Sequence, residues 1–442
     1  MLTIHDLHFK NEIVPLFDHV YNEHARDVLL QWMADRPASV SEIYSRQDIL
    51  KAMIRHDHLF RPFAYTRTEF HETQSYLNET GVRDKTNFLF SRSRRSRELS
   101  QLTNLFVFFN KIDQAWFQQL RPTEFPAEFR QSVQRIQRLF LDLDVRRQYD
   151  IIHNRGLSST ELPRLTRLIK DKVRSGEIGS FWNDFYLFEA CLSFAKGIVK
   201  HQFHFPTFVE EGLSIKAFYH PLIHNPVYND IEVTGAVTLI TGPNMSGKST
   251  LLKSIGLCVT LAHLGLAVPA ATCELVYFDV ISIAINLNDD ILSGYSHFMT
   301  EVMNLKSVVL QARETRRCFA VFDELFRGTN PEDALAISER TIHGLTQFKN
   351  SCFFISTHLH QLKESALANS DVRTHYIECQ LVKHKPVFTY TLKKGWSDLR
   401  IGQTIFEQEG LNDLLDRFST NYFALEGDLQ NSARPGRSNT PI

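Results

Sequence analysis

The chain has 442 residues, of which 43% are hydrophobic and 22% charged, and its formal net charge is −1. This composition is typical of a globular protein with about two or three domains, and it excludes a nucleic-acid binder that relies on an overall positive field. The six cysteines form no CxxC pair, which argues against a zinc module and favours a reducing compartment. The N-terminal stretch lacks a secretory pattern and no apolar run suits a bilayer, so we expect a cytoplasmic protein without membrane contact.

Helical patterns dominate the chain from Ile13 to about Phe205. In "FWNDFYLFEACLSFAKGIVK" apolar residues recur at alternating spacings of four and three, which predicts one long helix with a continuous apolar seam. That seam consists of Phe181, Phe185, Phe188, Leu192, Ala195 and Val199. Pro206 and Gly212 interrupt the pattern, so we predict a helical domain over residues 1–206.

Short apolar runs of β type alternate with helical segments after about Lys216. The runs are "AVTLI", "VYFDVISIAI", "CFAVF", "SCFFIS" and "VFTYTL". Strands that alternate with helices predict an α/β domain, here over residues 207–427. The polar residues 428–442 lack apolar periodicity and are expected to form a disordered tail. The predicted fold class is therefore multidomain, α followed by α/β.

The segment "TGPNMSGKST" fits the phosphate-loop pattern G-x-x-x-x-G-K-[ST] between an apolar strand and a helix. Glycines let the backbone wrap closely around phosphates, while N–H groups and the helix N-terminus attract their charge. Lys248 would neutralise the terminal phosphates and Ser249 would offer its hydroxyl to Mg²⁺. A chance match in a turn is the alternative, which the strand-loop-helix context disfavours.

Polar side chains follow two further strands. Asp323 and Glu324 come after "CFAVF", where one carboxylate can support Mg²⁺ while the other polarises an attacking water. Thr357 and His358 come after "CFFIS", in position to sense the γ-phosphate. Taken alone, the acidic pair is typical of a helix cap and the histidine of a structural residue. The ordered series instead predicts a P-loop ATPase that uses ATP and Mg²⁺.

These motifs resemble those of the MutS family of DNA mismatch-repair ATPases. The phosphate loop has that family's Pro-Asn-Met insert, and "NDDILSGYSHFMTE", "FDELFRGTNPEDALA" and "FISTHLHQL" are similar to its signature, Walker B and switch-histidine segments. "FYHPLI" and "YND" resemble the family's lead-in, and "GWSDLRIGQTIFEQEGL" its closing segment. The resemblance covers most of residues 207 to 415, and the two ends of the helical region are similar to the family's core and lever domain.

The resemblance implies a helical core or lever domain followed by an ABC-type P-loop NTPase domain. Because it starts within about the first twenty residues, we expect no N-terminal mismatch-recognition or connector domain. It implies that Glu324 activates water, that His358 is the switch residue and that Asp323 and Ser249 hold Mg²⁺. The implied nucleotide-binding residues are Gly242, Pro243, Asn244, Met245, Ser246, Gly247, Lys248, Ser249 and Thr250, with Tyr228 or Val227 in the place of the adenine-stacking aromatic.

The implied signature loop consists of Ser293, Gly294 and Ser296. In the family this loop completes the ATP site of a partner subunit, so the resemblance implies a homodimer. One departure concerns the same region: the family's Arg-Ile-Gly run is replaced here by Ala284 to Asn286, which puts the role of that loop in doubt.

Two basic stretches are candidates for contact with DNA. Arg92, Arg94, Arg95 and Arg97 in "SRSRRSR" can contact phosphates, or can form a solvated face paired with acids such as Glu98. The segment "PRLTRLIKDKVRSGE" offers the same two interpretations. The histidine pairs in "RHDHL" and "HQFHF" lack accompanying carboxylates or cysteines at ligand spacing, which favours structural roles over metal binding.

The expected function is that of an ATP-dependent DNA-binding protein of the MutS type. Hydrolysis would open and close a dimeric clamp on mismatched, branched or distorted DNA in repair or recombination. Because no nuclease motif occurs, cleavage would require a nuclease or another repair partner. Two alternatives stay open: an ATPase clamp that acts on RNA or ribosomes, and a nucleotide-dependent scaffold.

Overall fold

The computed structural model describes residues 2–3, 7, 9–82, 92–158, 160–285, 297–314, 316–326, 328–382, 385–399, 401–412 and 414–415. Contacts divide the chain into two compact units. The first unit comprises Val227–Lys253 and Ala284–Ile442 together with Met1, and the second comprises Leu2–Pro226 and Ser254–Ile283. The boundary between the units thus follows Pro226, and the second unit also contains the later segment Ser254–Ile283. The domain boundary predicted after residue 206 stays a prediction.

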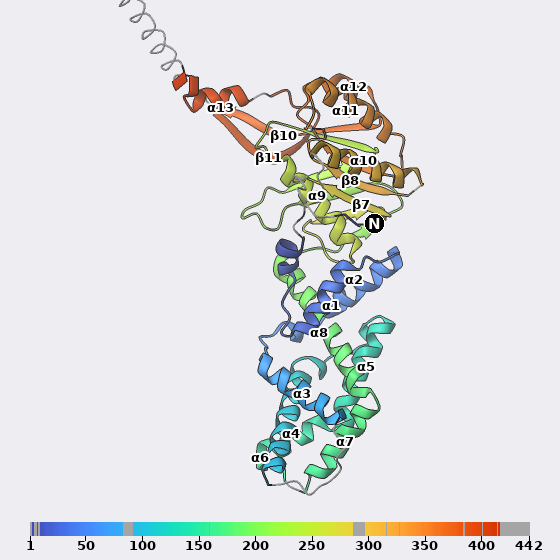
Figure 1. The fold of residues 1–442 in the computed structure, drawn as a ribbon, viewed down its shortest axis with the longest axis vertical. Coiled ribbons are helices and arrows are strands. Elements are labelled where there is room, and N and C mark those ends of the chain that lie inside the picture. Colours follow the sequence, from blue (N-terminus) through green and yellow to red (C-terminus); the bar gives the residue numbers. More distant parts are fainter. Residues whose placement is uncertain are drawn as a thin grey trace, which may run out of the picture. The chain divides into compact units, whose positions relative to one another are not determined.

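The second unit contains a bundle of helices. Its α-helices are α1 (Glu23–Ala34), α2 (Val40–Arg55), α3 (Arg67–Val82), α4 (Arg92–Ile112), α5 (Ala127–Asp142), α6 (Val145–Arg155), α7 (Leu162–Arg174) and α8 (Glu177–His201). Short 3-10 or π turns occupy Phe9–Ile13, Val14–Leu16, Asp57–Phe60, Asp113–Phe117 and Pro122–Glu124. Helix α8 packs against α1, α2, α5 and α7, and Figure 1 shows α5 running beside it.

The predicted long helix is confirmed as α8, but the predicted seam is wrong in two respects. The helix is buried on nearly every side, since Ala190, Cys191 and Phe194 are also inaccessible. Val199 is 46% exposed, whereas Ile198 is 2% exposed and belongs to the core. Helices therefore surround α8, and a helix that is apolar all round suits such a central position.

A buried carboxylate joins α8 to the start of α1. Glu189, which is 1% exposed, accepts hydrogen bonds from the Asn22 side-chain amide at 2.9 Å, from the Tyr65 hydroxyl and from the Tyr21 backbone N–H. Asn22 also caps α1 by accepting from the Ala25 N–H at 2.8 Å. Burial raises the pKa of Glu189, and these donors offset part of the cost of removing the carboxyl group from water.

Small β elements complete the second unit. Strand β1 (Leu2–Thr3) pairs in parallel with β7 (Val280–Ala284) through the partners Leu2 and Ile281. Strand β6 (Thr272–Leu275) pairs in parallel with β2 (Thr207–Phe208) and antiparallel with β3 (Leu213–Phe218).

The first unit is built on a mainly parallel sheet. Its strands run in the order β8 (Cys318–Phe322), β9 (Cys352–Ser356), β5 (Val237–Thr241), β10 (Val372–Val382) and β11 (Lys385–Lys394), with β11 antiparallel to β10. Every residue of β5, β8 and β9 is buried, as expected for a sheet covered on both faces. The unit also contains β4 (Asn229–Val233), α10 (His297–Arg313), α11 (Pro331–Leu345), the 3-10 turn His360–Leu362, α12 (Lys363–Ala368) and α13 (Gly402–Gln408). The predicted mixture of helical and α/β structure is confirmed.

The apolar segment after the phosphate loop forms a buried helix. This helix is α9 (Lys248–His263), whose Ile255, Leu257, Val259 and Leu261 are fully inaccessible. Within the part of the chain that the structure describes, no helix has the length and apolar character needed to cross a bilayer. The six cysteines are unpaired, and all except Cys379 are buried.

The two glycines of α8 give a test of how tightly this helix is packed. A Cβ added at Gly197 would lie 2.5 Å from the backbone oxygen of Leu16, whereas one added at Gly179 would meet nothing within 4 Å. We expect Gly197→Ala to lower the free energy of unfolding by about 1–3 kcal/mol, because backbone must move. The control Gly179→Ala is expected to raise it by up to about 1 kcal/mol. Urea unfolding followed by circular dichroism measures both, and equal midpoints would contradict tight packing at Gly197.

Candidate phosphate-binding site

The glycines of the phosphate loop adopt backbone conformations that other residues rarely reach. Gly242 and Gly247 have φ angles of 139° and 94°. A Cβ at Gly242 would lie 3.1 Å from Ser246 Oγ, so the loop has little room for a side chain there. The loop joins the predicted strand, observed as β5, to the N-terminus of α9, whose first turn contains Ser249 and Thr250. This is the strand-loop-helix arrangement on which phosphate binding depends.

Lys248 is the central cation of the loop. It is only 5% exposed, and its Nζ donates to the carbonyl oxygens of Gly242 and Pro243 at 3.0 and 3.2 Å. Asn244 Oδ1 lies 3.5 Å from the same nitrogen. The ammonium group is thus held by loop oxygens at the position where the sequence predicts a phosphate ligand. Its three donors suit an anion with several oxygens.

Two other loop residues bear on the fit of a phosphate group. Ser246 Oγ is buried and has no hydrogen-bond partner among the described residues, which leaves a hydroxyl available to an oxygen-rich ligand. Met245 is 74% exposed and has a φ of 69°, a left-handed conformation that is uncommon outside glycine. The loop thus offers a nucleotide phosphate chain three suitable groups: the hydroxyl of Ser246, the backbone around the two glycines and the ammonium group of Lys248.

The acidic pair follows β8, as predicted, and its turn is unusual. Asp323 N–H donates to Ala284 O at 3.1 Å, while Glu324 has a φ of 52° and Phe326 a φ of 65°. The alternative of a helix-capping pair is wrong, because α11 is capped by Asn330, whose side chain accepts from Asp333 N–H at 2.8 Å. The acidic pair therefore does not cap α11, and the backbone of Glu324 is held in a sparsely populated conformation.

Glu324 is the point where the three predicted strand ends meet. Its Oε1 lies 3.7 Å from Lys248 Nζ and 3.9 Å from His358 Nδ1. The Glu324 side chain is 16% exposed, and that of His358 is 51% exposed, so the histidine reaches the carboxylate from the solvent side. The structure thus brings together the phosphate lysine, the candidate water activator and the candidate switch residue.

Asp323 and Thr357 have local partners. The Ser356 hydroxyl donates to Asp323 Oδ1, and Glu324 N–H donates to the same hydroxyl at 2.9 Å. Thr357 is 6% exposed, and its Oγ1 accepts from Leu359 N–H at 3.1 Å. The threonine hydroxyl therefore shapes the turn that presents His358. Among the described residues no group of three or more His, Cys, Asp or Glu is placed to hold a metal, but Mg²⁺ at phosphate sites commonly uses only one or two carboxylates.

Tyr390 is a candidate site residue that no sequence motif selects. A Cβ at Gly247 would lie 3.1 Å from its ring, and the side chain is 48% exposed. Asn229 fixes its backbone, since Nδ2 donates to Tyr390 O at 3.0 Å and Oδ1 accepts from Leu392 N–H at 2.7 Å. Tyr228 and Val227, the alternatives for the adenine-stacking position, are 61% and 41% exposed, so the choice between them stays open.

The predicted signature residues Ser293, Gly294 and Ser296 lie outside the described residues, as does Asn286. The helix that follows them, α10, is described. Its Glu301 is 5% exposed and accepts a hydrogen bond from Phe326 N–H at 2.6 Å. The described part of the signature segment is therefore bonded to the turn that contains Glu324.

The first basic stretch forms the N-terminal turns of α4. Arg92, Arg95 and Arg97 are exposed and form no ion pair with a described side chain, whereas the side chain of Arg94 is not described. Glu98 accepts from the Tyr76 hydroxyl at 2.9 Å. The arginines are thus available to solvent, and their role in DNA binding stays a prediction.

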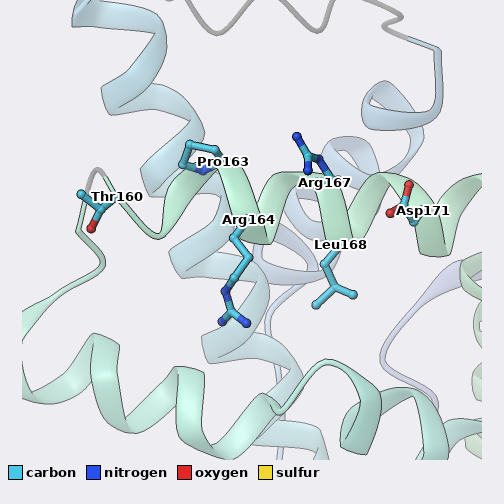
Figure 2. A pocket seen from close by; sticks show the side chains of 6 residues that line it. All are labelled: Thr160, Pro163, Arg164, Arg167, Leu168 and Asp171. Atoms are coloured by element: carbon cyan, nitrogen blue, oxygen red, sulfur yellow. The ribbon is translucent and has the colours of Figure 1, made fainter.

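The second basic stretch forms α7, beside a cavity of about 440 Å³. Thr160, Pro163, Arg164, Arg167, Leu168 and Asp171 line this cavity (Figure 2). In Figure 2 the side chains of Arg164 and Arg167 point away from each other, so their guanidinium groups are not directed at one common point.

The histidines of the first pair, His56 and His58, have packing partners. His58 Nε2 lies 3.0 Å from Trp116 O, and His56 stacks on Phe125 with ring centroids 5.6 Å apart. These contacts agree with the structural interpretation of "RHDHL".

A glycine loop lies between a buried strand and a helix, with a held lysine and a strand-end acidic pair beside it. The first unit thus has the arrangement of an α/β module that can accommodate a phosphate group. Among known proteins, residues 238–417 are similar to the family model described as MutS domain V. The predicted resemblance to MutS proteins is thereby confirmed.

Three relatives show how far this likeness extends. The chain is 27% identical over 355 residues to the DNA mismatch repair protein MutS of Listeria monocytogenes serotype 4b. The aligned residues cover 76% of this chain and 41% of that protein. Identity to the MutS of Staphylococcus saprophyticus is 28% over 352 residues, covering 75% and 39%. Identity to the MutS of Bacillus pumilus is 31% over 247 residues, covering 54% and 29%. The chain is thus MutS-like over about three quarters of its length and spans about two fifths of the first two of these relatives.

Asn229 gives a test of how Tyr390 is held. We expect Asn229→Ala to lower the free energy of unfolding by about 1–3 kcal/mol, because Tyr390 O and Leu392 N–H lose the same buried partner. Exposed Asn350 supplies the control Asn350→Ala, for which a change within about 0.5 kcal/mol is expected. Urea unfolding measures both variants. If the two midpoints coincide, Asn229 does not anchor this part of β11.

Proposed function

We propose that the protein is an ATPase of the MutS type whose hydrolysis cycle is coupled to DNA binding. The observation that carries the proposal is the meeting of Lys248 Nζ and His358 Nδ1 at the Glu324 carboxylate, within 3.7 and 3.9 Å. Passive nucleotide binding requires the loop and its lysine alone. A strand-end carboxylate and a histidine at the same point supply the groups that hydrolysis needs in addition.

In this proposal the chain's own residues divide the work of phosphoryl transfer. The loop N–H groups, Lys248 and Ser246 bind the phosphate oxygens. The exposed ring of Tyr390, and either Tyr228 or Val227, contribute to the binding of the base. Glu324 accepts the proton of the attacking water while ADP leaves, and His358 senses the γ-phosphate through its contact with Glu324. Asp323 and Ser249 would hold Mg²⁺, which when bound offsets the negative charge of the phosphates.

The proposal extends to a homodimer with ATP sites shared between subunits. Ser293, Gly294 and Ser296 would complete the partner's site, by analogy with the family's signature loop. Binding of ATP would draw two such modules together and hydrolysis would release them. The helical unit would carry that change to DNA. A nuclease or another repair protein would act with it, because cleavage chemistry has no motif in this sequence.

The choice of DNA as partner draws support from the relatives, which are named DNA mismatch repair proteins. The chain spans only part of those proteins, so branched or distorted DNA is proposed alongside mismatched DNA. An ATPase clamp on RNA or ribosomes and a non-hydrolysing scaffold are the competing functions. The cytoplasmic location also stays a prediction.

Glu324→Gln separates the ATPase from the scaffold. The amide keeps the shape of the side chain but cannot accept the proton of water, so we expect ATP turnover to fall by about 100-fold or more while ATP binding persists. Steady-state phosphate release and binding of a fluorescent ATP analogue measure the two properties. Glu339→Gln, at an exposed position on α11, is the matched control and should behave as wild type. A wild-type protein that binds ATP without turnover would favour the scaffold.

The arginines of α4 give the test of DNA binding. We expect replacement of Arg92, Arg95 and Arg97 by alanine to weaken duplex binding and to reduce the slope of log K against log salt by about 0.9 for each phosphate that the variant no longer neutralises. Binding is measured for mismatched duplex, four-way junction, perfect duplex and structured RNA across a salt series. The charge-matched control replaces three exposed arginines elsewhere in the same unit: Arg61, Arg121 and Arg147. Equal losses in both variants would exclude a specific role for α4, and tighter binding to RNA would favour the RNA clamp.

A further inference from the structure

A single buried hydroxyl is bonded to both members of the acidic pair. Ser356 is the last residue of β9 and is fully inaccessible. Its Oγ accepts from Glu324 N–H at 2.9 Å and donates to Asp323 Oδ1. A hydroxyl has one hydrogen, and the amide must be a donor, so the direction of both bonds is fixed. The backbone of one acid and the carboxylate of the other are thus held by the same atom.

These bonds act on two features that a hydrolytic site would need. Glu324 has a φ of 52°, and a left-handed conformation is unfavourable for a non-glycine residue, so a bond to its N–H helps to hold it there. The bond to Asp323 is charge-assisted and fixes the direction of that carboxylate. Ser356 also pairs with Ile240 of β5, just before the phosphate loop, and precedes Thr357 and His358.

We infer that Ser356 is a positioning residue that sets the carboxylate of Asp323 for Mg²⁺ and the backbone of Glu324 for catalysis. The inference rests on the proposed ATPase function. Groups that orient a metal ligand typically contribute about 10–100-fold to metal affinity. The role therefore predicts a loss confined to the Mg²⁺-dependent part of nucleotide binding. A residue that merely stabilised the sheet would weaken binding with and without Mg²⁺ alike.

The test measures binding of a fluorescent ATP analogue to the whole chain as Mg²⁺ is titrated, and separately in EDTA. Ser356→Ala removes the hydroxyl, and we expect its Mg²⁺ midpoint to rise by about 10–100-fold while binding in EDTA stays as in wild type. Ser356→Thr keeps the hydroxyl and is expected to retain the wild-type midpoint. In an Asp323→Ala background, Ser356→Ala should add no further shift, because the two residues act as a unit.

Thr238 supplies a matched control. It lies on the adjacent strand β5, it is fully inaccessible, and its Oγ1 has no hydrogen-bond partner within the described ranges. Thr238→Val therefore removes a buried hydroxyl of the same sheet without changing the acidic pair, and its Mg²⁺ midpoint should equal that of wild type.

The outcomes separate this inference from the function on which it rests. An unchanged midpoint in Ser356→Ala, equal weakening with and without Mg²⁺, or an additive shift in the Asp323→Ala background would overturn the role of Ser356. A Thr variant that behaves as the Ala variant would do the same. Wild-type protein that binds the Mg²⁺ complex of the analogue but never hydrolyses ATP would instead reject the proposed ATPase while leaving the positioning role in place.

Discussion

The buried ammonium group of Lys248 is the feature on which the candidate site depends. A cation that is only 5% exposed is costly unless oxygen atoms surround it. Here the oxygens come from the carbonyls of Gly242 and Pro243 and, at longer range, from Glu324. The same loop contains two glycines with positive φ angles, Gly242 and Gly247. The oxygens that surround this one charge thus come both from the loop and from the acidic pair after β8.

The strand order of the first unit explains why Glu324 is the acid that lies near Lys248. Strand β9 lies between β5 and β8, so the residues after all three strands reach the same edge of the sheet. Glu324 follows β8 and His358 follows β9, which explains why segments distant in sequence meet the loop after β5. Ser356, on the middle strand, is the residue best placed to bond to the turn after β8. The geometry of the site is therefore a property of the sheet as a whole.

Sequence periodicity and motif spacing predicted the elements of this site but not the contacts between them. The strands around Leu239, Val321 and Phe354 could be found because buried parallel strands are continuous apolar runs. The buried residues at the end of α8 were less predictable. Val199 fits the spacing of a helical seam, but Ile198 is the residue that is buried there. Tyr390 could not be found at all, since its contact with the loop arises from Asn229 and from the pairing of β10 with β11.

The conformation of the turn that contains Glu324 could not be predicted from the sequence either. It depends on contacts with residues that are distant along the chain. Nothing local in "DELFRG" requires a left-handed backbone at Glu324 and Phe326, because neither residue is a glycine. The conformation is held from outside the turn, by Ser356 at the N–H of Glu324 and by Glu301 at the N–H of Phe326. One of these supports comes from the strand that leads to His358 and the other from the helix that follows the signature segment. A displacement of either element would change the bonds that hold this turn, so the position of the Glu324 carboxylate depends on both elements.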